Sequence, residues 1–166
     1  MLFRSSWFDW RGIGPDDEQL LAFVRRLIAL RRAHPALRRE RFLHGRDRSA
    51  DGLKDITWLA PQGTEKTEAQ WRDTHARCFG MLLNGQAGTY RSWDGRPADD
   101  QVLLLLLNAY HDTVPFTLPP IAGAEGWRRI LDTTEPEVTD DPRIYASGKP
   151  FDMPGRSVVL LVCQPA

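Results

Sequence analysis

The sequence has little of several features that would narrow its class at once. Only two cysteines, Cys78 and Cys163, occur in 166 residues, so there is no disulfide framework to interpret. Both lie in strand-like runs, and we expect them to be buried free thiols. No apolar run approaches the roughly 20 residues that a membrane-spanning helix needs, and the N-terminus has no cleavage pattern of a signal peptide. We therefore expect a cytoplasmic protein with no membrane partner.

The chain also has no excess of positive or negative charge. The chain carries 22 basic and 22 acidic residues, for a formal net charge of zero, which argues against a protein built mainly to hold nucleic acid. The four histidines are scattered and lack the spacing of metal ligands: His34, His44, His75 and His111. The glycine-rich stretch 84–88 lacks the Lys-Ser/Thr end of a phosphate-binding loop. We expect no metal, no cofactor and no catalytic residue in this chain.

The most informative stretch that is present runs from Gln101 to His111. It contains five consecutive leucines after Val102 and is flanked by turn-forming residues, which favours a strand over a buried helix. Because polar residues do not alternate with the leucines, we expect both faces of this strand to be covered. We interpret it as the central strand of a β-sandwich.

A long helix is predicted to precede the sandwich. Pro15 and three acidic residues form a good helix start, and His34-Pro35 ends or kinks the helix. Its apolar positions cover roughly half the circumference, wider than the stripe of an ordinary surface helix. The helix therefore requires contact on two sides. One side can be the sandwich, whereas the other has no obvious partner in this chain.

The remaining pattern predicts about six strands with turns between them. The other expected strands are 56–59, 78–83, 114–118, 127–131 and 157–163, with a capped short helix around Trp71. We expect the strand 114–118 to pair with the central strand as a hairpin, and residues 133–150 to form a long loop. The predicted fold is mainly β: an antiparallel β-sandwich preceded by one long amphipathic α-helix.

The N-terminal residues are unusually aromatic for a chain end. Two interpretations remain open for Trp7, Phe8 and Trp10. The rings could pack against a neighbour that this chain lacks, or the indoles could stack on sugar rings. Trp7 and Trp10 are therefore weak candidates for carbohydrate binding.

The ordered series of motifs resembles the C-terminal part of bacterial glycogen debranching enzymes of the GlgX and isoamylase type, in the α-amylase superfamily. The resemblance rests on Ser6–Trp10, Leu20–Leu37, Asp55–Leu59, Glu68–Trp71, Leu104–His111, Trp127–Arg128 and Ser157–Leu161. It implies that residues 1–40 are a remnant of the last loop and helix of a catalytic (β/α)₈ barrel. Residues 41–166 would then be the C-terminal β-sandwich domain.

The resemblance also implies what is missing. A barrel takes about 250 residues, and in this family the catalytic carboxylates lie on barrel strands that have no counterpart here. The leading hypothesis is thus a non-catalytic C-terminal portion of a glycogen debranching α-1,6-glucosidase that stabilises the catalytic barrel, and we expect a fragment or truncated product. The alternatives are a glucan-binding module and a self-associating interaction domain. The expected partners are the barrel, a second copy of the chain, or an α-glucan.

Overall fold

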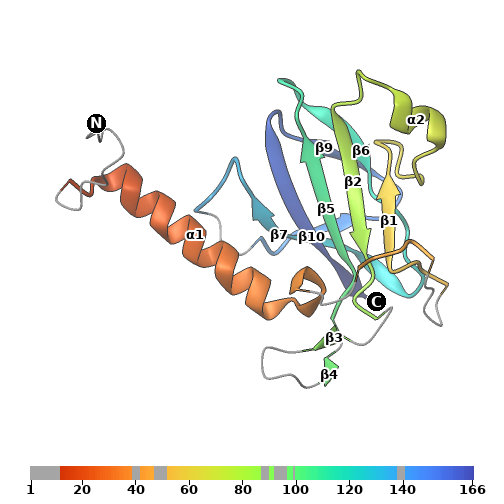
Figure 1. The fold of residues 1–166 in the computed structure, drawn as a ribbon, viewed down its shortest axis with the longest axis horizontal. Coiled ribbons are helices and arrows are strands. Elements are labelled where there is room, and N and C mark those ends of the chain that lie inside the picture. The colour runs from red at the N-terminus through yellow and green to blue at the C-terminus, as the bar shows by residue number, and fades with distance from the viewer. Residues whose placement is uncertain are drawn as a thin grey trace, which may run out of the picture.

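The computed structural model describes residues 12–38, 42–46, 52–86, 90–91, 97–98, 100–137 and 141–166. Its centre is a six-stranded antiparallel sheet with the strand order β1-β2-β5-β10-β7-β8 (Figure 1). The strands of this sheet are β1 (Ile56–Leu59), β2 (Cys78–Leu83), β5 (Leu103–Asn108), β7 (Ala124–Asp132), β8 (Ile144–Ala146) and β10 (Ser157–Pro165). Two further pairs are β3 (Tyr90–Arg91) with β4 (Pro97–Ala98), and β6 (Val114–Thr117) with β9 (Pro150–Met153).

Three helical segments accompany the strands. They are α1 (Pro15–Ala33), the 3₁₀ turn η2 (Pro35–Arg38) and the short helix α2 (Glu68–Arg72). The Gly14 amide donates to Asp17 Oδ2 at 2.9 Å and closes the start of α1, and the non-helical backbone at His34 ends it. At α2, Thr67 and Gln70 form the predicted capping box. The expected long helix and the helix around Trp71 are both confirmed.

Strand β5 has the central position that the leucine run predicts. It lies between β2 and β10, with Leu104 paired to Leu82 on one side and to Leu161 on the other. Leu103, Leu104 and Leu106 have no exposed surface. Successive side chains of a strand point to opposite faces, so β5 contributes to two separate apolar layers, as expected from the absence of polar alternation.

The first layer lies between the large sheet and the β6–β9 pair. Phe116 of β6 and Met153 of β9 are fully buried against Leu104 and Leu106. Trp127 is also fully buried, and its Nε1 donates to the Pro119 carbonyl oxygen at 2.9 Å. This hydrogen bond satisfies the only polar atom of the indole side chain, which is the usual condition for burying it.

The second layer lies on the opposite face of the large sheet, beneath the helical segments. Leu103 and Leu160 are buried there, together with Ala36 of η2. Phe23 and Leu30 of α1 pack against this cluster. The helical segments therefore cover the face of the large sheet that the β6–β9 pair leaves open. The expected mainly β sandwich with a preceding helix is confirmed.

The predicted hairpin between 114–118 and the central strand is wrong. Strand β6 pairs with β9, with Val114 opposite Met153 and Phe116 opposite Phe151. Both edges of β5 are already occupied by β2 and β10, so the chain crosses to the second sheet instead of turning back. The expected loop 133–150 is also partly wrong, because it contains β8 and the first residue of β9.

Two other observations complete the description. Cys78 and Cys163 are buried free thiols, as expected. In the part of the chain that the structure describes, no helix is both long enough and apolar enough to cross a membrane.

Candidate functional site: the exposed face of the long helix

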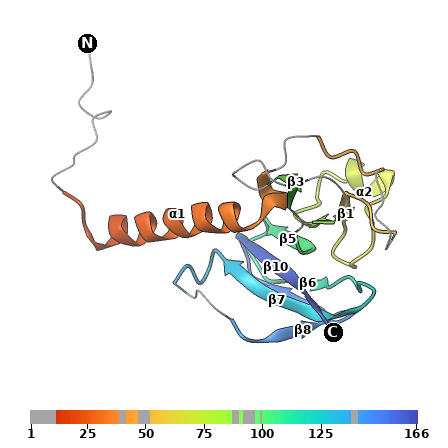
Figure 2. The ribbon, with the colours of Figure 1, turned by 90° about the horizontal axis from the view of Figure 1, so that it is seen from below.

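The first turns of α1 project beyond the sandwich, and only one side of the helix touches it (Figure 2). No residue of α1 is buried. Phe23 and Leu30 are partly buried against the second apolar layer. The apolar residues Leu20, Leu21, Val24, Leu27 and Ile28 remain 36–62% exposed, and we call these five residues the apolar stripe.

The apolar stripe is continuous along the helix. At 100° per residue, its five members fall within an arc of about 120°, next to the side that carries Phe23 and Leu30. On the edge of the stripe away from Phe23 and Leu30 lie the exposed residues Glu18, Arg25 and Ala29. The wide apolar coverage in the sequence therefore divides into one packed side and one exposed side.

A polar anchor holds α1 against the end of β7 and the loop that follows it. The Arg26 guanidinium donates to the carbonyl oxygens of Ile130 at 2.7 Å and Pro136 at 3.1 Å. Burial of this guanidinium, followed by repulsion from Arg129, lowers the pKa of Arg26. Arg26 stays charged despite this shift because the ordinary pKa of arginine is above 12.

The carbonyl groups that Arg26 uses belong to a segment organised by a buried ion network. Arg129 lies 2.8 Å from Asp132, 2.6 Å from Glu135 and 3.0 Å from Asp141. Arg143 also donates to Asp141, and this interaction is the main reason that the pKa of Asp141 lies well below its usual value. The sequence interpretation did not single out this network. The available signal was the pair Arg128-Arg129 followed three residues later by Asp132.

A second anchor holds the end of α1. Asp100 lies just before β5, and its Oδ1 is 2.9 Å from His34 Nδ1. Its Oδ2 accepts from the Ala36 amide at 3.0 Å, and its Oδ1 also accepts from the Gln101 amide at 2.8 Å. One carboxylate therefore connects the end of α1 and the start of η2 to the central strand.

The other candidates from the sequence have separate outcomes. Trp7 and Trp10 lie outside the described residues, so the carbohydrate-binding prediction at these positions stays a prediction. Trp127 is a core residue, whereas Trp71 is 49% exposed and forms an edge contact with Trp58. Among the residues that the structure describes, no group of three or more His, Cys, Asp or Glu side chains could hold a metal ion.

The fold defines an antiparallel β-sandwich domain joined to a preceding helix whose outer side is exposed. Comparison with known proteins then gives its family. Residues 55–162 match the family described as isoamylase, C-terminal, and the chain belongs to this family.

Similar proteins share this assignment. The chain is 37% identical over 157 residues to a glycogen operon protein GlgX homolog of Mycobacterium tuberculosis, covering 94% of this chain and 22% of the relative. It is 26% identical over 155 residues to an isoamylase of Pseudomonas amyloderamosa, covering 89% and 18%. A glycogen debranching enzyme of Klebsiella pneumoniae is 32% identical over 126 residues, covering 75% and 14%.

The chain therefore spans about a fifth of the length of the relatives that it matches. The resemblance to the C-terminal region of GlgX-type enzymes is confirmed. The chain corresponds to a C-terminal, non-catalytic portion of such an enzyme.

Proposed function

We propose that this chain packs through α1 against the catalytic portion of a glycogen debranching α-1,6-glucosidase and stabilises it. The observation that carries this proposal is the apolar stripe, which is exposed although the adjacent side of the same helix is packed. Contiguous exposed apolar surface of this kind is a common mark of an interaction site. The division into a barrel remnant (1–40) and a sandwich domain (41–166) belongs to the same proposal, as does the cytoplasmic location.

The size of the stripe favours a partner held at high effective concentration. The five exposures together equal little more than two fully exposed side chains, and burying them contributes roughly 3–7 kcal/mol. Association of two separate molecules costs about 4–15 kcal/mol in lost translational and rotational freedom. The stripe is therefore strong enough to seat a linked domain but weak for holding two independent chains.

The length of the relatives supports a catalytic portion as the partner. The segment that matches this chain makes up 22% of the mycobacterial GlgX homolog, so most of that relative lies outside the match. We infer that a corresponding catalytic portion covers the stripe. A second copy of the chain, the alternative partner, would use the same five residues. We expect this self-association to be weak, because the free energy from burying the stripe falls within or below the range of costs for associating two separate molecules.

A chimera tests the proposal. The matching segment of the mycobacterial GlgX homolog is replaced by this chain, and debranching activity and its half-life during heating are measured. Val24→Asp places a charge in the middle of the stripe, whereas Ala29→Asp places the same charge on an exposed side of α1 outside the stripe. We expect Val24→Asp to shorten the half-life several-fold and Ala29→Asp to leave it nearly unchanged.

Equal effects of the two substitutions would contradict docking through the stripe. The isolated chain provides two further checks. It should release no reducing ends from glycogen limit dextrin, because the carboxylate pair of glycoside hydrolysis is expected in the part of the relatives that this chain does not match. Light scattering should show a monomer at micromolar concentration, and a stable dimer would instead support self-association.

A further inference from the structure

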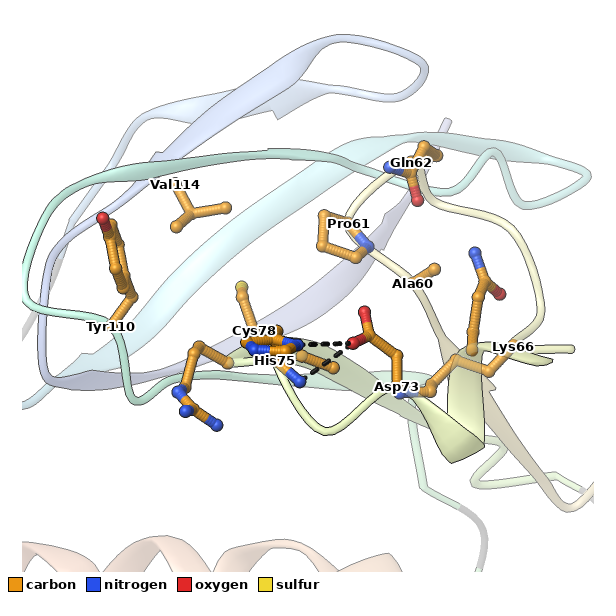
Figure 3. A pocket seen from close by; sticks show the side chains of 12 residues that line it. Ala60, Pro61, Gln62, Lys66, Asp73, His75, Cys78, Tyr110 and Val114 are labelled. Carbon is orange, nitrogen blue, oxygen red and sulfur yellow. Dashed lines mark hydrogen bonds and ion pairs between the residues drawn. The ribbon is translucent and has the colours of Figure 1, made fainter. Parts of the chain in front are cut away.

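A hollow of about 520 Å³ lies beside α2 (Figure 3). The helix α2 itself lies far from the first turns of α1 (Figure 1). We call this hollow the α2 hollow. Its walls come from the turn after β1, from α2, from the loop 73–77 and from the connection between β5 and β6. Its volume falls within the range of small-ligand sites, about 300–1,000 Å³.

Backbone hydrogen bonds hold these walls in place. The Ala60 amide donates to the Thr64 carbonyl oxygen at 2.8 Å, and the Thr117 amide donates to Pro61 at 2.8 Å. On the other side, the Ala109 amide donates to the Arg77 carbonyl oxygen at 2.8 Å. The hollow is therefore formed by segments that are already fixed, and binding there requires little ordering of the chain.

One wall of the α2 hollow is apolar and aromatic. Tyr110 is 40% exposed, and its ring lies 4.2 Å from the His111 ring between centroids. Figure 3 shows Tyr110 on one side of the hollow and Gln62 on the opposite side, with Asp73 and His75 between them. A supported aromatic ring at the side of an open hollow suits the apolar face of a sugar ring.

The opposite wall offers hydrogen-bonding groups. The Gln62 side chain is exposed and has no hydrogen-bond partner among the described residues. Gln70 Oε1 accepts from the Thr67 amide at 2.9 Å, and the Nε2 group of the same side chain is a hydrogen-bond donor. Asp73 Oδ1 accepts from the His75 amide at 2.9 Å, and its second carboxylate oxygen is an additional acceptor. Amide and carboxylate groups of this kind bind neutral hydroxyl groups.

Each of the two strong cations of the hollow has another contact. Lys66 Nζ lies 4.3 Å from the centre of the Trp71 ring, and Arg77 Nη1 donates to the Thr74 carbonyl oxygen at 3.0 Å. A phosphate site normally presents unengaged arginine or lysine groups or clustered backbone amides. The nearby Asp73 carboxylate further disfavours an anion. The chemistry of the walls thus favours an uncharged polyhydroxy ligand.

We infer that the α2 hollow binds a short linear stretch of α-linked glucose units. The aromatic ring would stack on one sugar, and the facing amide and carboxylate groups would bind the hydroxyl groups of its neighbours. The linkage is inferred from the family, whose relatives are named for glycogen and for isoamylase. This site is independent of the proposed docking through α1, because the hollow and the apolar stripe share no residue.

The test is titration of the full chain with maltohexaose, followed by calorimetry and by NMR shifts of the backbone amides. We expect saturable binding and shifts confined to residues 60–77 and 109–114. Tyr110→Ala should weaken binding by about tenfold, which corresponds to about 1.4 kcal/mol. Phe42→Ala is the matched control, since Phe42 is 87% exposed and does not line the hollow, and it should change nothing.

Gln62→Ala supplies a second variant, because removing an exposed side chain leaves folding intact even if Tyr110→Ala does not fold. It should weaken binding several-fold. Absence of maltohexaose binding at a concentration of about 10 mM would overturn the inference. So would equal binding of cellohexaose, displacement of maltohexaose by inorganic phosphate, or binding that neither variant changes. None of these outcomes depends on a catalytic partner, so they leave the proposed docking function unaffected.

Discussion

Replacing Arg129 by methionine should destabilise the domain more than any other single change to a charged residue in its ion network. Arg129 is 8% exposed and approaches Asp132, Glu135 and Asp141 within 3.0 Å. Asp141 retains Arg143 as a partner, and Glu135 is half exposed to water. The cost therefore falls mainly on Asp132, a buried carboxylate whose remaining side-chain hydrogen bonds within the described residues come from Thr134.

The magnitude follows from this arrangement. Removing one partner of a buried ion pair typically costs 3–5 kcal/mol, and the remaining hydrogen bonds to Asp132 place the expected loss near the lower value, about 3 kcal/mol. For a chain of this size each kcal/mol corresponds to about 2–4 °C in Tm, so the transition should move down by roughly 6–12 °C. Urea denaturation followed by circular dichroism measures the free energy of unfolding.

Two further variants separate buried charge from surface charge. Glu135→Gln should cost less than about 1 kcal/mol, because a half-exposed ion pair contributes little. In the double variant Arg129→Met with Asp132→Asn, no uncompensated charge remains at position 132. Its loss of unfolding free energy should therefore be smaller than the sum of the losses in the two single variants. A loss below about 1 kcal/mol for Arg129→Met, or strict additivity in the double variant, would refute this reasoning.

Three other predictions concern protonation and close packing. Arg143 holds the pKa of Asp141 below its usual value, so as the pH falls Asp141 is protonated in the unfolded chain before it is protonated in the folded chain. The free energy of unfolding should therefore decrease as the pH drops below about 4. Urea midpoints measured between pH 7 and 3 should show this decrease, and Asp141→Asn should make it smaller. Burial raises the pKa of Cys78 to about 11, so at pH 8 a thiol reagent such as DTNB should react with this cysteine only after the protein unfolds; fast labelling of the native chain would contradict the buried position. Gly85→Ala should destabilise the domain by roughly 1–3 kcal/mol in thermal unfolding, because an added Cβ would lie 2.3 Å from the Asp100 carbonyl oxygen; an unchanged Tm would show that the backbone there can shift.

Local signals in the sequence were sufficient for the elements that depend on local physics. The leucine run predicted β5 and its two covered faces, and the proline and acidic residues predicted the start of α1. The apolar residues of α1 cover about half of its circumference, and this predicted that the sandwich could not cover the whole apolar surface of the helix. The Thr67 to Gln70 spacing predicted the cap of α2, because a capping box involves only neighbouring residues.

Pairings between distant segments were not predictable in the same way. The crossing of β6 to pair with β9 depends on β2 and β10 having occupied both edges of β5, and no local pattern contains that information. The β8 strand is only three residues long, too short for a period-2 pattern to identify it. The α2 hollow likewise combines Gln62 with Tyr110, which are distant in the sequence, so its polar and aromatic walls meet only in the folded chain.

The position of Asp100 has a consequence for how the two proposed surfaces relate to each other. Its carboxylate contacts His34 and Ala36 at the end of the helical segment and Gln101 at the approach to β5. Tilting α1 relative to the sheet would therefore require breaking the hydrogen bonds of this carboxylate, just before the central strand. We therefore expect the helix to behave as a rigid extension of the sheet and not to move independently of it. Any enzyme portion seated on the outer side of α1 would thus meet a glucan chain in the α2 hollow at one fixed distance and angle.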